Sequence, residues 1–278
     1  HLTPHFSLWY GCMDQTGRII AINVQKREYI MSGHSKWATI KHKKGIADAK
    51  RGQAFTKLIK EISVAAKMGG SDPDSNARLR TAIIKARADN MPKDNIERAI
   101  KKGAGEMEGS TYYELTYEGY APGGVALIVD TLTDNKNRTA ADVRSTLTKL
   151  GGSLGTSGSV SYLFQTKGVI TYDASTYSED DIFEAALDLG AEDVSNTGDV
   201  IELVTEASDF VSVLEGMQQK GFTESSAEVT KIADTTVSLD LEKTRKVLKI
   251  IERLEDLDDV QSVASNLDIP EYYTDEDE

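Results

Sequence analysis

The residues of this chain that offer the most chemistry are cations gathered near the start of the sequence. Phosphate recognition needs many cations on one surface, because each neutralised phosphate releases counterions and the contributions accumulate. Trp37 lies among the cations and could stack on an unpaired base or pack against a neighbouring helix. This density of positive charge predicts that the region binds a polyanion. Eight cations lie between residues 36 and 60: Lys36, Lys41, Lys43, Lys44, Lys50, Arg51, Lys57 and Lys60.

Other side chains extend this predicted nucleic-acid-binding footprint. His34 and His42 lie in the same stretch, where either can contact a phosphate. The stretch from Ser32 to Lys44 has few apolar anchors, and we expect it to be a mobile arm when no nucleic acid is bound. Lys57 and Lys60, taken alone, would suit the solvated face of a helix. A following helix is expected to add Arg78, Arg80, Lys85 and Arg87, with Lys93, Lys101 and Lys102 at the margin.

The net charge of −13 conceals a strong asymmetry along the chain. Residues 31–109 hold 17 Lys+Arg and 9 Asp+Glu, a net of +8, whereas residues 110–278 hold 12 and 34, a net of −22. Such a split predicts that the basic part meets a polyanion while the acidic part stays away from it.

Residue patterns typical of catalysis or metal binding are not found in the sequence. Cys12 is the single cysteine, which excludes an internal disulfide framework and a cysteine-based zinc site. The motif H-E-x-x-H does not occur, and the G-x-S-x-G match at residues 151–155, GGSLG, lies at the end of a predicted helix and before a predicted strand, the reverse of the strand-to-helix turn that exposes a nucleophilic serine. We therefore expect no catalytic residues, no metal and no cofactor, and we do not expect an enzyme.

Two polar stretches deserve a closer reading. TDNKNRT, residues 133–139, offers a possible secondary polar site for an anion at a helix start, formed by Asp134, Asn135, Asn137 and Arg138; the alternative is a polar loop with Asn137 as helix N-cap. GGSLGTSGS, residues 151–159, resembles a glycine-rich phosphate cradle. No G-K-[ST] follows it, so a tight connection from helix to strand is favoured.

The basic residues must be positioned by helices. Apolar residues recur every three or four positions between 46 and 68, and Gly69 and Gly70 follow as a stop. A second helix is expected from about 79 to 90, and a third from Pro92 to Gly103. Three helices with one apolar stripe each predict a small bundle, followed by a linker at 103–110.

Beyond the linker the apolar period changes to two, which indicates strands. Strands are expected at 111–120, 125–133, 159–164, 167–173, 199–206, 226–239 and 260–266. Helices are expected at 137–152, 178–190, 208–221 and 241–260, with a capping box at Ser178. The alternation predicts two successive α/β units, each a layer of helices on a sheet.

The two ends of the chain are expected to lie outside the core. Residues 1–30 read as a leader or extension, with Met31 a plausible start, and 274–278 as an acidic tail. No run reaches the roughly 18 apolar residues needed to span a membrane. We expect a cytoplasmic protein, without a membrane partner, that acts as a monomer.

Three stretches closely resemble the YebC family, which includes the mitochondrial translational activator of cytochrome c oxidase subunit I. They are SGHSKWATIKHKKGIADAKRGQAFTKLIKEI, NARLRTAIIKARADNMPKDNIERAIKKG, and YEGYAPGGVALIVDTLTDNKNRTAADVRSTLTKLGGSLGTSGSVSYLF. The resemblance runs from about Ser32 to Ile269. It implies an α+β multidomain fold: a basic helical domain at 31–109, a discontinuous α/β domain at 111–165 plus 237–273, and a third α/β domain at 166–236 inserted within it.

The resemblance also implies a role in gene expression. The family has long been described as probable DNA-binding transcriptional regulators, and members have been linked to ribosomes and to translation through difficult sequences such as proline runs. A glycine-interrupted basic arm without an obvious helix-turn-helix suits RNA better than a palindromic DNA site.

The leading hypothesis is a ribosome-associated translation factor that docks on ribosomal RNA through residues 34–60. A DNA-binding transcriptional regulator is the alternative within the same class. From other classes, a protein-interaction adaptor using the acidic surface remains open, as does an enzyme with a pocket near TDNKNRT and GGSLGTSGS.

Overall fold

A computed structural model describes residues 10–13, 19–22, 48–108, 111–196, 198–270 and 273. Residues 1–30 form a unit of their own, in which β1 (Tyr10–Met13) pairs antiparallel with β2 (Ile19–Ile22). Everything that follows concerns the second unit, residues 31–278. Among the described residues, no helix has both the length and the apolar character that crossing a membrane requires.

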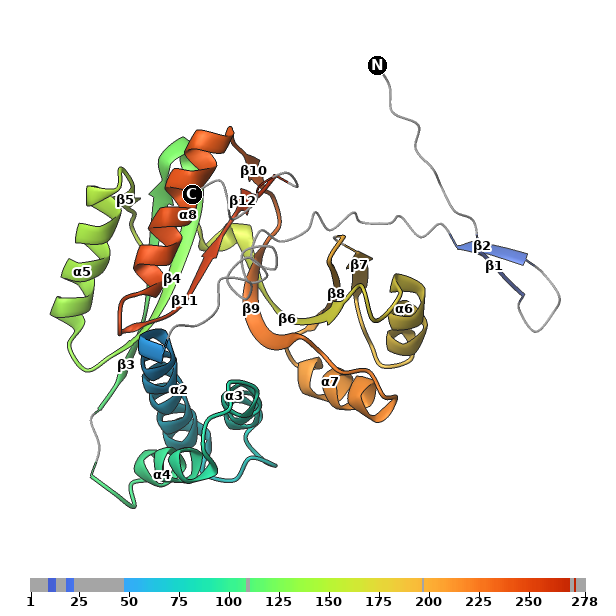
Figure 1. Cartoon of the computed structure of the whole chain (residues 1–278), viewed down its shortest axis with the longest axis horizontal. Helices are drawn as coiled ribbons and strands as arrows, with labels where there is room; N and C mark the ends of the chain where they lie inside the picture. The colour runs from blue at the N-terminus through green and yellow to red at the C-terminus, as the bar shows by residue number, and fades with distance from the viewer. Residues whose placement is uncertain are drawn as a thin grey trace. The chain divides into compact units, whose positions relative to one another are not determined.

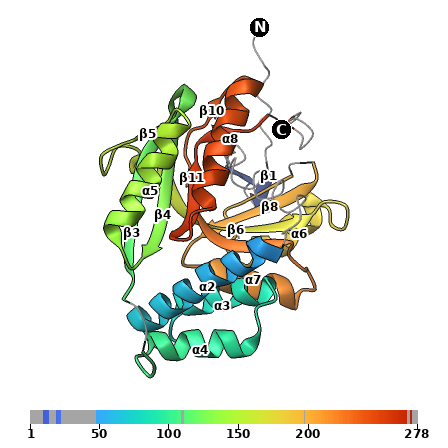
Figure 2. The ribbon, with the colours of Figure 1, turned by 60° about the vertical axis from the view of Figure 1, so that its left-hand side comes forward.

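The basic part of the chain folds into three helices, α2 (Asp48–Gly69), α3 (Ala77–Ala88) and α4 (Lys93–Gly103) (Figure 2). Their apolar stripes meet in one core that includes Ile62 and Leu79, both fully buried. Asn76 joins two of the helices: its Oδ1 accepts from the backbone N–H of Leu79, while its Nδ2 donates to the carbonyl of Ala65. The helix bundle expected from the 3.6-residue period is confirmed.

The first sheet combines strands that are far apart in the sequence (Figure 1). Its order is β11-β4-β3-β5, all antiparallel, built from β3 (Tyr113–Ala121), β4 (Val125–Thr133), β5 (Ser153–Leu154) and β11 (Val260–Ser265). Two helices, α5 (Lys136–Lys149) and α8 (Leu241–Glu255), share one apolar core with this sheet. A short parallel pair, β10 (Val237–Ser238) with β12 (Leu267–Asp268), completes this part.

The second sheet is made from the intervening chain. Its order is β7-β8-β6-β9, again antiparallel, from β6 (Phe164–Asp173), β7 (Asp193–Asn196), β8 (Val200–Glu206) and β9 (Ser226–Ala233). Helices α6 (Glu179–Leu187) and α7 (Phe210–Gln219) pack against the side chains of Ile170, Tyr172 and Leu203. The predicted fold class is confirmed: a helical bundle precedes two α/β parts, one inserted within the other. The domain boundaries themselves stay a prediction.

Two local predictions are wrong. Residues 159–164 do not form a separate strand: Ser161–Leu163 is a single 3-10 turn, and β6 runs without a break from Phe164. The backbone N–H groups of Val160 and Ser161 donate to the Glu118 carboxylate instead of to a neighbouring strand. The N-cap of α5 is Asn135, not Asn137, because the Asn135 side chain accepts from the N–H of Arg138.

Candidate nucleic-acid interface

The structure describes only part of the predicted nucleic-acid-binding set. Lys50 and Arg51 belong to the first turn of α2, and their side chains are not described. The remaining residues of the predicted arm lie outside the described residues: His34, Lys36, Trp37, Lys41, His42, Lys43 and Lys44.

Further along α2, the cations contact the end of α8 and the turn after it. Lys57 Nζ donates to the carbonyl oxygen of Glu255 at 2.5 Å. Lys60 Nζ donates to the carbonyl of Asp258 at 3.0 Å and to the carboxylate of Asp259 at 2.9 Å. A lysine at the carbonyl end of a helix complements the negative end of the helix dipole. These cations therefore attach the bundle to the first α/β part.

Asp259 is the centre of this attachment. The residue is 6% exposed, and its carboxylate accepts from Lys60, from Arg138 Nη2 at 2.7 Å, and from the hydroxyls of Thr139 at 2.9 Å and Thr133 at 3.1 Å. Burial by itself raises the pKa of a carboxyl group, but the hydrogen bonds from Arg138, Lys60 and Thr139 outweigh it and hold the pKa of Asp259 at about 2. Asp259 is thus a permanent anion at neutral pH.

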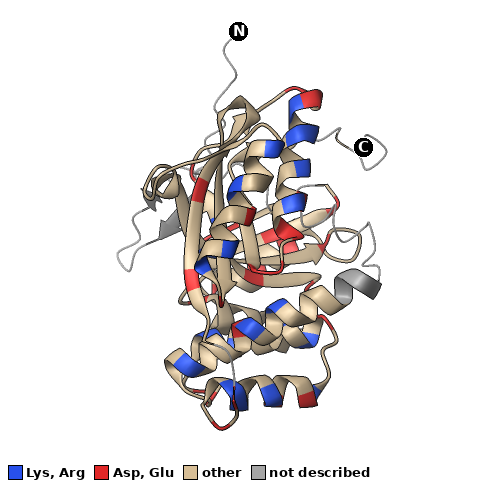
Figure 3. Cartoon of the chain, turned by 90° about the vertical axis from the view of Figure 1, so that its left-hand side faces the viewer, with Lys and Arg blue, Asp and Glu red and all other residues tan. Residues whose placement is uncertain are grey.

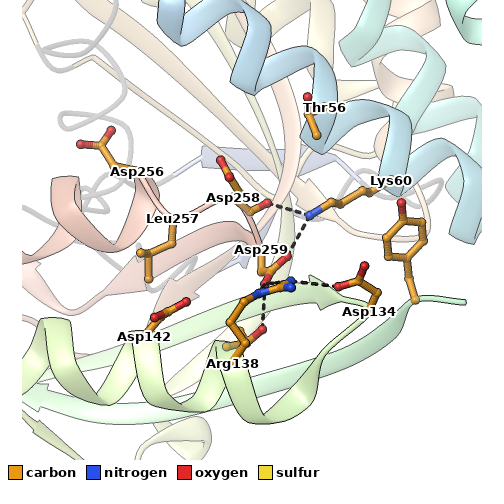
Figure 4. A pocket seen from close by; sticks show the side chains of 11 residues that line it. Thr56, Lys60, Asp134, Arg138, Asp142, Asp256, Leu257, Asp258 and Asp259 are labelled. Carbon is orange, nitrogen blue, oxygen red and sulfur yellow. Dashed lines mark hydrogen bonds and ion pairs between the residues drawn. The ribbon is translucent and has the colours of Figure 1, made fainter. Parts of the chain in front are cut away.

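A hollow of about 550 Å³ opens beside this carboxylate (Figure 4). Its lining comes from α2, from the region around α5 and from the turn after α8: Thr56, Lys60, Tyr112, Asp134, Arg138, Thr139, Asp142, Asp256, Leu257, Asp258 and Asp259. Of the possible secondary polar site, Asp134 and Arg138 line the hollow, Asn135 caps α5, and Asn137 is exposed on the first turn without lining it.

The hollow has little to offer acid–base chemistry. Arg138 donates to both Asp259 and Asp134, and these hydrogen bonds raise the pKa of its guanidinium further above its usual value. Both perturbed groups therefore stay charged near pH 7 and do not exchange protons there. The described part of the chain also contains no cluster of three acidic, His or Cys side chains arranged to hold a metal.

Two of the four predicted cations of α3, Arg78 and Lys85, form ion pairs with carboxylates of the described residues. Arg78 bonds Glu61 through Nε at 2.7 Å and also pairs with Glu114. Although burial lowers the pKa of Arg78, these two carboxylates raise it by more. Lys85 pairs with Glu228 of β9 at 2.8 Å, and the charge of that carboxylate raises the pKa of Lys85.

The other two predicted residues of α3 are unlike these. Arg80 is half-buried, and its Nε has no hydrogen-bond partner among the described residues. Arg87 is exposed. Next to Lys85, Ile84 packs against the core beneath the second sheet, so one side of α3 is covered by the inserted part.

Sequence reasoning missed that four of these cations are engaged within the molecule. Lys57, Lys60, Arg78 and Lys85 contact groups that lie up to about two hundred positions away in the sequence. The acidic parts therefore neutralise some of the basic domain as well as carrying their own charge. The sequence signal for these contacts was the opposite net charge of the two halves of the chain. Opposite charge indicates that the halves attract each other, but it does not identify the residues that form ion pairs.

The end of the glycine-rich stretch at 151–159 and the two residues after it bind a carboxylate of the protein itself. Glu118 on β3 is buried, and its two oxygens accept from the backbone N–H groups of Gly158 at 2.6 Å, Val160 at 2.7 Å and Ser161 at 2.8 Å. Burial raises the pKa of Glu118, but the three backbone hydrogen bonds lower it by more, and the net pKa lies below the usual range. The favoured alternative, a helix-to-strand connection, is confirmed in position between α5 and β6.

Comparison with known proteins gives consistent results. The family described as "TACO1/YebC protein N-terminal domain" matches residues 35–106, and "TACO1/YebC second and third domain" matches residues 112–267. The chain is 64% identical over 241 residues to a "Probable transcriptional regulatory protein" of Treponema denticola, covering 87% of this chain and 98% of the relative. A protein of the same description from Trichlorobacter lovleyi is 59% identical over 239 residues, covering 86% and 96%.

A solved structure is also similar. The crystal structure of a conserved hypothetical protein from Aquifex aeolicus is 50% identical in sequence and superposes with a TM-score of 0.77. The match covers 84% of this chain and 97% of that one. Similarity in sequence and in fold thus extends over most of the chain.

Proposed function

Because the chain belongs to the TACO1/YebC family, we propose that it is a nucleic-acid-binding regulator of gene expression. The specific role that we propose is that of a ribosome-associated translation factor, which contacts ribosomal RNA through residues 34–60. It would act in the cytoplasm as a monomer, with the ribosome as its partner.

The observation that carries this proposal is the excess of positive charge in the sequence that precedes and begins α2. Residues 34–51 hold six Lys+Arg and two histidines against one acid, Asp48. Cations further along, from Lys57 to Lys85, are in large part neutralised by carboxylates and carbonyls of the acidic parts. A polyanion is therefore attracted mainly to the segment that precedes and begins α2.

RNA is favoured over duplex DNA by the surroundings of α3. A recognition helix must expose one side to enter a major groove. One side of α3 packs on α2 through Leu79 and Ala82, and Ile84 and Lys85 contact the inserted part. A basic segment interrupted by glycines, such as residues 33–52, suits the irregular phosphates of folded RNA without requiring a groove-reading helix.

Charge reversal in the arm tests the proposal. The variant Lys41→Glu, Lys43→Glu, Lys44→Glu, Arg51→Glu is expected to abolish co-sedimentation with ribosomes and to leave the circular dichroism spectrum unchanged. The control reverses four exposed cations of α4, Lys93, Arg98, Lys101 and Lys102, and so makes the same change in net charge. Three of them are predicted to lie only at the margin of the footprint, and Arg98 is not part of it. Its loss of binding is expected to be much smaller. Sedimentation of the arm variant equal to that of the unmodified chain would contradict the proposal.

DNA-binding transcriptional regulation is the second candidate, because the curated relatives are described as probable transcriptional regulatory proteins. It requires that a specific DNA site bind more tightly than random DNA by roughly a factor of 10³ or more at physiological salt. Selection of bound sequences from a random DNA library, with ribosomal RNA as competitor, separates the two candidates. A strongly enriched DNA site that resists the competitor would favour transcription.

A further inference from the structure

A second basic surface lies in the acidic half of the chain, on the two helices that cover the first sheet. Helices α5 and α8 carry nine of the twelve Lys+Arg of residues 110–278 but only four of its 34 Asp+Glu. Figure 3 shows blue segments along both helices on the side turned to the viewer. The net charge of the two helices is +5, within a region whose net charge is −22.

The helices present this charge to solvent because their other sides are buried. Val143 and Leu147 of α5 and Ile251 and Leu254 of α8 belong to the core beneath them. The cations of the opposite side are exposed, and we name six of them the α5–α8 basic face: Lys136, Arg144, Lys149, Arg245, Lys249 and Arg253. The three on α8 are four residues apart, so they form one row with a spacing of about 6 Å.

Most of these cations are available to an outside partner. Within the described residues Arg144, Lys149, Lys249 and Arg253 form no ion pair, unlike Lys60, Arg78 and Lys85 of the bundle. Lys243 and Lys246, near the start of α8, are paired with Asp240 and Glu242 and are not included. The face therefore keeps positive charge that no carboxylate among the described residues neutralises.

The side chains of the face also indicate what kind of contact it makes. Large apolar side chains that are exposed in the described structure lie on other elements, such as Tyr162, Phe183 and Met68. One exposed aromatic side chain borders the face: the ring of Tyr113 on β3 lies under Lys136, whose Nζ is 4.1 Å from the ring centre. A face of cations with no aromatic or apolar centre of its own offers neither base stacking nor a typical protein-interface core. Such a face suits phosphates, which position a nucleic acid without reading its sequence.

The row on α8 leads toward the bundle. Arg253 lies in the last turn of α8, two residues before Glu255, whose carbonyl accepts from Lys57 of α2. The carboxylates of the hollow, Asp142, Asp256 and Asp258 among them, lie at this same end and would repel phosphates from the hollow itself. A polyanion held by the start of α2 would thus continue along the outward rows of α8 and α5.

We propose that the α5–α8 basic face is a second contact surface for the phosphate backbone of RNA. The inference rests on the proposed function, since it assigns a further surface to the same ligand. Each contacted phosphate on a single strand contributes about 0.7 to the slope of log affinity against log salt. Removing four cations that all make contact therefore reduces the slope by roughly 3, and partial contact reduces it by less.

The test compares three variants of the full chain with the unmodified protein. The face variant carries Arg144→Glu, Lys149→Glu, Lys249→Glu and Arg253→Glu; the arm variant and the α4 control are those described above. The probe is a labelled poly(U) 30-mer, titrated at several salt concentrations. We expect the face variant to bind about tenfold or more weakly than the α4 control and to show a salt slope that is lower by roughly 2 to 3.

Each outcome separates the two proposals. If the arm variant binds weakly and the face variant matches the control, the second surface is overturned and the proposed function stands. If the face variant alone binds weakly, the second surface is supported and the arm is not the main site. If neither differs from the control, both are overturned. Loss of ribosome co-sedimentation by the face variant with unchanged poly(U) affinity overturns the RNA contact in favour of an acidic protein partner.

A second variant guards against misfolding. Arg144→Gln, Lys149→Gln, Lys249→Gln and Arg253→Gln removes the same charges without adding carboxylates. It is expected to keep the thermal unfolding midpoint of the unmodified chain and to reduce the salt slope as the face variant does. A salt slope equal to that of the unmodified chain overturns the second surface.

Discussion

Glu118 lies where the glycine-rich stretch would otherwise present its N–H groups to an external phosphate. Three backbone donors, on Gly158, Val160 and Ser161, converge on its carboxylate. Hydrogen bonds to a buried charged group are worth about 1.5–3 kcal/mol each in net stability, more than bonds between neutral groups. The carboxylate thus fixes the path of the loop between α5 and β6, and the loop is not free to cradle a nucleotide.

Replacing this carboxylate with an amide is expected to destabilise the fold. Glu118→Gln removes the charge and turns an NH₂ group toward backbone donors, so we expect a loss of about 2–3 kcal/mol in the free energy of unfolding, measured in urea at pH 7. The pKa of Glu118 is lowered by folding. Its contribution is therefore present above the unfolded pKa of about 4.3 and is lost as pH falls through the folded value.

The pH dependence supplies the control. The difference between Glu118→Gln and the unmodified chain should be full at pH 7 and smaller at about pH 3, because the effect of the charge is lost as pH falls from about 4.3 through the lowered folded pKa, and a protonated glutamate resembles the amide. Glu184→Gln, at an exposed position on α6, should change stability by less than about 0.5 kcal/mol at either pH. A loss that stays constant across this range would mean that the charge of Glu118 is not what holds the loop.

At the scale of elements, the periodicity of apolar residues predicted which segments are helices and longer strands. It did not predict the residue at which each element begins. The stripes of α2, α3 and α8 were visible in the sequence, since their buried residues recur every three or four positions. The short strands β5, β7 and β12 were missed, because two to four residues are too few to show a period, and β10 was predicted as a continuation of β9. Strand β6 was divided in two because its buried and exposed residues do not alternate regularly.

The start of α5 illustrates a choice that sequence alone could not make. Asn135 and Asn137 both precede the apolar stripe, and both residue types suit an N-cap. Tertiary contacts decide between them: Thr133 and Thr139 are held by Asp259, which places the first helical turn at Lys136. The deciding residue lies 120 positions or more further along the chain.

The assignment of Asn135 as the N-cap of α5 gives a testable prediction, and Asn137 provides the control. Asn135→Ala removes the acceptor of the Arg138 N–H and is expected to lower the free energy of unfolding by about 1 kcal/mol. Asn137→Ala, two residues later, replaces an exposed helical residue with a better helix former and should leave stability unchanged or slightly higher. Urea unfolding of the two variants side by side checks the cap; the reverse order of stabilities would return the cap to Asn137.

At the scale of the whole molecule, the basic helices and the acidic parts carry opposite net charge, and ion pairs connect them. The sequence predicted a basic domain and an acidic remainder, and the opposite signs are consistent with the ion pairs that join α2 and α3 to the other parts. The sequence did not predict which cations form these ion pairs. Lys60 and Asp259 are 199 positions apart, and only the folded arrangement of β4, α5 and β11 brings them together. The sequence therefore predicts a basic region, and it does not predict which of its cations are engaged within the molecule.

The Lys60–Asp259 pair makes this attachment measurable. The side chains are 12% and 8% exposed, so a double-mutant cycle with Lys60→Met and Asp259→Asn is expected to give a coupling of about 1–3 kcal/mol. Hydrogen exchange of the α2 amides is the measurement, because it reports detachment of the bundle without requiring that the whole chain unfold in one step. Since the pKa of Asp259 is lowered to about 2, the coupling should persist from pH 7 to about 4 and disappear only as pH falls toward 2.

Lys93 and Glu97 on α4 provide the comparison, because the same bundle holds this pair in a solvated setting. Their side chains are 84% and 53% exposed at a separation of 3.5 Å, and exposed pairs of this kind contribute about 0.5 kcal/mol or less. A cycle with Lys93→Met and Glu97→Gln should therefore show little coupling, and added salt should remove it. If the two cycles gave equal couplings, burial would not be what strengthens the Asp259 contact, and the bundle would be held to the acidic parts mainly by apolar packing such as that of Ile84.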